Sequence, residues 1–188
     1  MTDLPTQSTM GAMRKKSEIQ MFRKRLGRLL TFLPAVCMAF LIFSFSAQTG
    51  SESASLSGRI TKVLVQAADR IAGAGWTEEE IRDRAGACEL YVRKAAHMTE
   101  YAVFAASLLL PLRGCGLRGR RLYLTTFLIC AGFAAGDEWH QSFVGGRGPS
   151  VRDVGIDCAG AGIGEGIAGL ILESRKRRKI RHARWNKC

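Results

Sequence analysis

Apolar residues in this chain gather in long runs, and most charged residues lie between those runs. No charged residue occurs from Leu29 to Ser51 or from Leu122 to Gly136. A helical run of roughly 20 apolar residues is long enough to cross the hydrocarbon core of a bilayer. The pattern predicts an all-α polytopic membrane bundle of four transmembrane helices, at about 28–47, 94–112, 121–141 and 153–172. A soluble bundle of very apolar helices is the alternative, and the basic flanks of the runs count against it.

Basic residues concentrate in the three segments that four spans would place on one side of the membrane. Of the 28 Lys and Arg residues, seven lie in 1–28, four in 113–121 and eight in 173–188. Because basic loops are retained in the cytoplasm, both termini are predicted to be cytoplasmic. The chain then divides into a basic N-terminal segment (1–27), a membrane domain (28–172) and a basic tail (173–188). This topology accounts for the net charge of +12.

The same topology predicts the partners of the basic segments and the state of the first span. Basic residues beside a membrane helix attract anionic lipid headgroups, so we expect membrane lipids and no nucleic acid as partners. The first apolar run, with small residues at Ser46 and Ala47, resembles a signal peptide but is longer than a typical signal core. We therefore expect an uncleaved anchor. Of the six scattered cysteines, which form no CxxC pair, Cys88 is expected outside and Cys115 inside.

The segment 48–93 is predicted to be extracytoplasmic and helical. Its apolar residues recur at helical spacing: Leu56, Ile60, Val63, Leu64, Ala67 and Ile71. Such a helix either lies on the outer membrane surface or covers the bundle, and we favour packing over a mobile lid because the stripe needs no ligand to explain it. Gly73–Gly75 should end the helix. Thr77 and Glu80 have capping-box spacing, so a second helix should begin there and run towards the second span.

Ionisable and polar residues cluster at the outer ends of three predicted spans. Many are three or four positions apart and so share a helix face. An ionisable group within a span is costly and usually faces a bundle interior or a watery cavity. We therefore expect one polar pocket, open to the outside. Its candidate catalytic residues are His97, Glu100, Tyr101, Asp137, Glu138, Gln141, Asp153 and Asp157, and Glu165 could form its floor.

The loop GGRGPS between the third and fourth spans is a candidate anion-binding element. Its glycines permit unusual backbone angles, and backbone amides in such turns can bind anions. Arg147 offers a planar fork for phosphate or carboxylate, and Lys94 is the second candidate for anion binding. In the alternative interpretation, the loop is a tight turn whose Arg147 pairs with Asp153.

Three hypotheses for the cluster stay open. In the first, the protein is an enzyme whose crowded carboxylates carry out acid–base chemistry or, with His97, hold a divalent metal. In the second, the pocket binds a lipid headgroup, a glycopeptide or a partner protein without reaction. In the third, the polar residues knit the helices together through buried pairs such as Arg147–Asp153 and His97–Glu138.

Three stretches together resemble the VanZ-like family: SAQTGSESASLSGRI, RKAAHMTEYAVF and DEWHQSFVGGRGPSVRDVGIDCAGAGIG. The resemblance covers about residues 40–168. It implies a small integral protein of the bacterial cytoplasmic membrane, and the founding member of the family is associated with low-level teicoplanin resistance. The family's polar positions correspond to His97, Glu100, Tyr101, Asp137, Glu138, Gln141, Arg147, Asp153 and Asp157. We expect the pocket to bind or act on a lipid-linked envelope precursor or a cell-surface anionic molecule.

Overall fold

A computed structural model describes residues 7–185 as six α-helices, with no strand in that range. They are α1 (Gln7–Leu30), α2 (Leu33–Ser46), α3 (Gly50–Ala72), α4 (Glu78–Gly114), α5 (Gly119–Gln141) and α6 (Val151–Trp185). The all-α prediction is confirmed. The basic terminal segments, 1–27 and 173–188, are therefore helical over most of their length. Their outermost parts, residues 1–6 and 186–188 with Cys188, lie outside the described residues.

Three helical stretches are long and apolar enough to cross a membrane: Ser17–Ser46, Glu78–Gly114 and Val151–Lys179. They correspond to the first, second and fourth predicted spans. The third predicted span coincides with α5, which is not among them. The reason is visible in its sequence, because α5 begins with two arginines and ends in the polar run Asp137–Gln141.

The first predicted span, 28–47, is interrupted near its start by a break between two helices. The α1 helix ends at Leu30, and α2 begins at Leu33 after a turn at Thr31 and Phe32. Pro34 lies in the first turn of α2, where its fixed φ angle and missing N–H are compatible with a helix start. The predicted boundary at residue 28 therefore falls within α1 and not at the start of a helix.

The α4 and α6 helices pack directly against each other through glycine. A Cβ added at Gly160 or Gly164 of α6 would collide with the α4 backbone at Met98 and Ala102, respectively. Side-chain-free positions at this spacing let two membrane helices approach closely. A Cβ at Gly162 or Gly166 would meet nothing nearby. Only the first of the two GxxxG spacings therefore brings helices together.

The segment 48–93 forms two helical stretches, as predicted, and α3 pairs with the first part of α4 in a hairpin. Gly73 ends α3 with a φ of 63°, in the left-handed region that favours glycine. Thr77 caps α4 in a complete capping box with Glu80, which confirms the predicted start. A second capping box, Thr49 with Glu52, starts α3 and was not predicted.

At about 1.5 Å per residue, the 37-residue α4 is about 55 Å long, so it exceeds a membrane core of about 30 Å.

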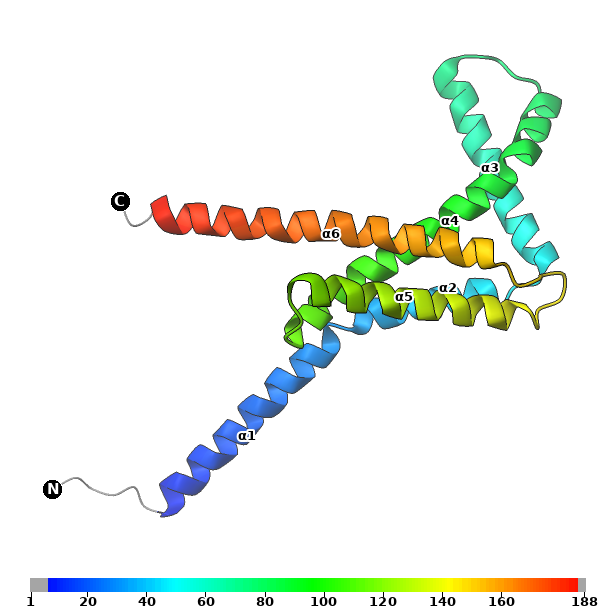
Figure 1. Cartoon of the computed structure of the whole chain (residues 1–188). Helices are drawn as coiled ribbons and strands as arrows, with labels where there is room; N and C mark the ends of the chain where they lie inside the picture. Colours follow the sequence, from blue (N-terminus) through cyan, green and yellow to red (C-terminus); the bar gives the residue numbers. More distant parts are fainter. Residues whose placement is uncertain (1–6, 186–188) are drawn as a thin grey trace.

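The apolar stripe of α3 does not cover the bundle. Ser57 and Thr61 are the buried residues of α3, whereas Ile60, Val63, Leu64 and Ile71 are exposed. Of the two predicted placements of this stripe, covering the bundle is therefore wrong, and lying on the outer membrane surface stays a prediction. Figure 1 shows α3 beside the first part of α4, where the hairpin projects beyond the other helices.

The chain turns at two opposite ends of the bundle. In Figure 1 the α2–α3 junction and the α5–α6 loop lie at one end, and the α4–α5 turn lies at the other. The Gly50 N–H donates to the Gly145 carbonyl at 3.1 Å, which ties the start of α3 to the α5–α6 loop. Gly146 has a φ of 76° and leaves no room for a Cβ at Gly50. This contact fixes the loop that carries Arg147.

Candidate functional site

A cavity of about 240 Å³ lies between α4, the end of α5, the α5–α6 loop and the start of α6. Its walls come from two separate regions of the sequence, 90–97 and 138–157. Seven of the ten predicted site residues line it: Lys94, His97, Glu138, Gln141, Arg147, Asp153 and Asp157. The other three, Glu100, Tyr101 and Asp137, are not part of this lining.

Several buried oxygens, on residues that line the cavity or were predicted to line it, have no hydrogen-bond partner among the described residues. Asp137 and Asp157 are 3% and 2% exposed, and one carboxylate oxygen of each has no hydrogen-bond partner among the described residues. The same holds for the Tyr101 hydroxyl and one oxygen of Glu100. Asp137 accepts one bond, from the Gln141 amide at 3.1 Å. Because native proteins rarely bury polar atoms without partners, these oxygens indicate a place for solvent or ligand atoms.

Two contacts fasten the start of α6 at the cavity mouth. Lys94 Nζ donates to Asp153 Oδ1 at 2.6 Å, and the Ser150 N–H donates to Glu138 Oε2 at 2.8 Å. The first joins α4 to α6, and the second joins α5 to the loop before α6. Lys94, a predicted anion-binding residue, therefore has a carboxylate partner within the protein.

Arg147 remains the cation with the least compensation at this mouth. Its side chain donates only a long hydrogen bond, 3.5 Å, to the Ser46 carbonyl. The alternative pair with Asp153 is not formed, since Asp153 pairs with Lys94. Burial, with a smaller effect of Arg93, lowers the pKa of Arg147 from its usual value. A guanidinium nevertheless keeps its charge at neutral pH, so no carboxylate within residues 7–185 pairs with this positive charge.

His97 lines the cavity and lies near Glu100 of its own helix. Its Nδ1 atom is 3.9 Å from Glu100 Oε2, beyond hydrogen-bonding distance. The predicted pair His97–Glu138 is not formed, because Glu138 accepts from the Ser150 backbone. His97 therefore has freedom to hydrogen bond with a molecule in the cavity.

The candidate metal ligands do not converge. Among the described residues, no three His, Cys, Asp or Glu side chains form a group that could hold a metal ion. This applies to the set considered from the sequence, His97, Glu100, Asp137, Glu138 and Asp157.

Two residues that sequence reasoning missed complete the surroundings. Arg93 lines the cavity, and its guanidinium pairs with Glu89 at 2.6 Å. Ser46, at the end of α2, is fully buried, and its hydroxyl has no partner among the described residues. The position of Arg93, next to Lys94 and four residues before His97, could have suggested its role. Glu165 is also buried, but it does not line the cavity.

Comparison with known sequences identifies the family. The sequence model of the VanZ/LLP1 family matches residues 31–172. The chain belongs to the VanZ/LLP1 family. The match spans all ten predicted site residues and confirms the resemblance drawn from the three motifs. No curated protein and no solved structure matches the chain. Together with its apolar helices, family membership identifies a membrane protein.

Proposed function

We propose that this protein binds the anionic group of a lipid-linked or cell-surface molecule in an outward-facing pocket. The observation that carries the proposal is Arg147, a partly buried cation without a carboxylate partner in the described chain, at a cavity beside buried carboxylates. A guanidinium binds phosphate or carboxylate through two parallel hydrogen bonds. His97 lines the same cavity and offers a further hydrogen bond.

The proposed setting is the bacterial cytoplasmic membrane, with four spans and both termini in the cytoplasm. In this topology α5 is the third span, although its composition alone does not identify it. Its buried residues Leu122, Cys130 and Ala134 belong to the common core with α4 and α6, which supports its place in the bundle. The basic segments 1–28, 113–121 and 173–188 then lie on the cytoplasmic side, and the cavity lies on the outer side.

The pocket residues are suited to acid–base chemistry on the bound molecule. Arg147 would hold the anionic group, and Asp157, which lines the cavity and has one carboxylate oxygen without a partner among the described residues, would donate or accept protons. We propose a hydrolase or transferase acting on an envelope lipid or glycan. A change in susceptibility to glycopeptides such as teicoplanin would follow from altered surface targets.

A structural role for the polar cluster is the second candidate. The Lys94–Asp153 ion pair and the Glu138–Ser150 hydrogen bond support it, because each joins two elements of the bundle. In that role the cluster would stabilise the fold, and its loss would reduce protein abundance. Breaking a partly exposed ion pair of this kind costs about 0.2–1 kcal/mol.

Conservative variants separate these candidates. Arg147→Lys keeps the charge but removes the bidentate fork, and Asp137→Asn keeps the shape but removes the charge. We expect both variants to reach the membrane at wild-type levels and to lose the change in teicoplanin susceptibility that the wild type confers on a sensitive host. Arg152→Lys, on the exposed side of α6, is the matched control and should behave as wild type.

The outcomes distinguish a ligand site from a structural cluster. Normal abundance with lost activity supports the pocket, and mass spectrometry of envelope lipids and glycans then tests for a reaction. Reduced abundance in parallel with activity supports the structural role. Normal abundance with normal activity in both variants contradicts the proposed pocket.

A further inference from the structure

A second cavity adjoins the polar one and shares three residues with it. It measures about 230 Å³ and is enclosed by the end of α2, by α3 and by α4. The exposed area of its lining is mostly apolar and comes from Phe45, Leu56, Ile60, Val92 and Ala96, and Glu100 is the one carboxylate of the lining. Arg93, His97 and Arg147 belong to both linings. The two cavities therefore meet at a cationic and histidine-bearing boundary.

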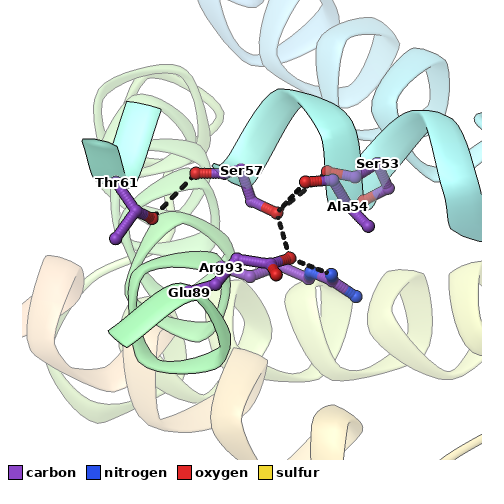
Figure 2. Close-up of polar contacts among 6 residues, drawn as sticks. All are labelled: Ser53, Ala54, Ser57, Thr61, Glu89 and Arg93. Carbon is purple, nitrogen blue, oxygen red and sulfur yellow. Dashed lines mark hydrogen bonds and ion pairs between the residues drawn. The ribbon is translucent and has the colours of Figure 1, made fainter. Parts of the chain in front are cut away.

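Polar contacts hold α3 against α4 and leave its apolar side free. Ser57 Oγ donates to Glu89 Oε1 at 2.7 Å, and the Arg93 guanidinium donates to the same oxygen at 2.6 Å (Figure 2). Thr61 on the same face is buried and bonds within α3, to the Ser57 carbonyl at 2.7 Å. An apolar face turned away from the protein needs another apolar environment.

The apolar wall of the second cavity is continuous with that free face. Leu56 and Ile60 line the cavity, and Ile60 also borders the exposed stripe with Val63 and Leu64. A path of apolar side chains therefore runs from the surface of α3 to Arg147 and His97. A surface that is apolar at one end and cationic at the other is complementary to an amphiphile with an anionic headgroup.

We propose that the groove between α2, α3 and α4 receives the hydrocarbon chain of a phosphate-bearing lipid directly from the outer leaflet. The phosphate then lies at Arg147, on the boundary of the two cavities, and the rest of the headgroup extends into the polar cavity. The inference rests on the proposed outward-facing anion pocket. It adds a binding site for the chain and a lateral route of access along α3.

Photolabelling from within the bilayer tests this groove. The full-length protein is placed in phosphatidylcholine nanodiscs that contain a small fraction of phosphatidylglycerol with a photoreactive diazirine on its acyl chain. Mass spectrometry after irradiation locates the labelled residues. We expect labelling at 53–60 and 92–96. Leu56→Trp fills the groove and should reduce that labelling by about tenfold, equivalent to about 1.4 kcal/mol of binding.

Two further variants show whether a loss of labelling comes from filling the groove or only from adding a bulky side chain. Ile71→Trp adds the same bulk on the exposed stripe of α3 but lies outside the groove, so groove labelling should not change. Ala96→Leu narrows the groove from the α4 side and replaces Leu56→Trp if that variant does not fold. Labelling spread evenly along the α3 stripe and insensitive to both groove variants would overturn the proposal, as would a co-purified protein segment occupying the groove.

A phosphate compound without a hydrocarbon chain tests the proposed anion pocket separately from the proposed groove. Glycerol phosphate should raise the thermal stability of the wild type in detergent and should have no effect on Arg147→Lys. Stabilisation by glycerol phosphate without labelling of the groove would overturn the groove and leave the anion pocket standing. Groove labelling without any response to glycerol phosphate would support chain binding and contradict the anion site.

Discussion

Lys94 of α4 and Asp153 of α6 form an ion pair of 2.6 Å at the mouth of the polar cavity. The pair joins residues 59 positions apart in the sequence. Arg147 lines the same cavity and has no carboxylate partner among the described residues. The pair therefore fastens the start of α6 beside a guanidinium that is available to a ligand.

The contribution of this pair should be measurable as a coupling. Both side chains are partly exposed, so we expect Lys94→Met or Asp153→Asn to cost about 0.2–1 kcal/mol, which corresponds to a Tm decrease of roughly 0.4–4 °C. Thermal unfolding in detergent of the two single variants and the double variant provides the measurement. The double variant should lose less than the sum of the singles, and strictly additive losses would show that the two residues do not interact.

The contact between α4 and α6 predicts that alanine substitutions at two nearby glycines change the stability of the protein very differently. In Gly164→Ala the new methyl group collides with the α4 backbone at Ala102, and overpacking of this kind costs about 1–3 kcal/mol. Gly162→Ala, two residues earlier, meets open space and should gain slightly from the higher helix propensity of alanine. Thermal stability and the folded fraction in detergent report the effect. Equal stability of the two variants would contradict the close approach.

Local sequence patterns predicted helix boundaries well where the deciding interactions join residues that are close in the sequence. The capping box of Thr77 and Glu80 involves residues three positions apart, so its residue types and spacing are sufficient to predict a helix start. The clustering of polar residues at one level was predicted from the alternating direction of the successive predicted spans. In the structure, seven of the ten predicted residues line one cavity.

Relationships between distant residues could not be predicted in the same way. The stripe of α3 shows that one face is apolar, but the pattern is identical whether protein or lipid covers it. The choice between Arg147–Asp153 and Lys94–Asp153 depends on where a loop places one side chain relative to another helix. The α5 helix shows a third limit, because its polar residues lower its apolar character and its composition alone does not identify it as a span.

The capping box at the start of α3 should make that end of the helix sensitive to acid. Hydrogen bonds from the Thr49 side chain and backbone lower the pKa of Glu52. A lowered native pKa means that the carboxylate stabilises the fold above its unfolded pKa, and that this contribution is lost as the pH falls through the native value. Hydrogen exchange of the first-turn amides, corrected for intrinsic rates, should therefore show weaker protection below about pH 4.

Glu52→Gln is the control for this acid response. The variant cannot titrate, so its protection should not change over the same pH range. Thr49→Ala should weaken protection of the α3 start at every pH, because the N-terminal cap itself is lost. A pH response in Glu52→Gln equal to that of the wild type would assign the effect to another group.

Two native cysteines provide the test of the proposed membrane orientation. Cys88 lies on the part of α4 that pairs with α3, Cys115 lies in the α4–α5 turn, and both are exposed. In variants that retain one of them, with the other five cysteines replaced by serine, Cys88 should react with an impermeant maleimide added to intact cells. Cys115 should react only after the membrane is permeabilised, because the four arginines of 113–121 keep that turn in the cytoplasm. The opposite labelling would place the polar cavity on the cytoplasmic side, and a lipid from the outer leaflet could then not reach Arg147 along α3.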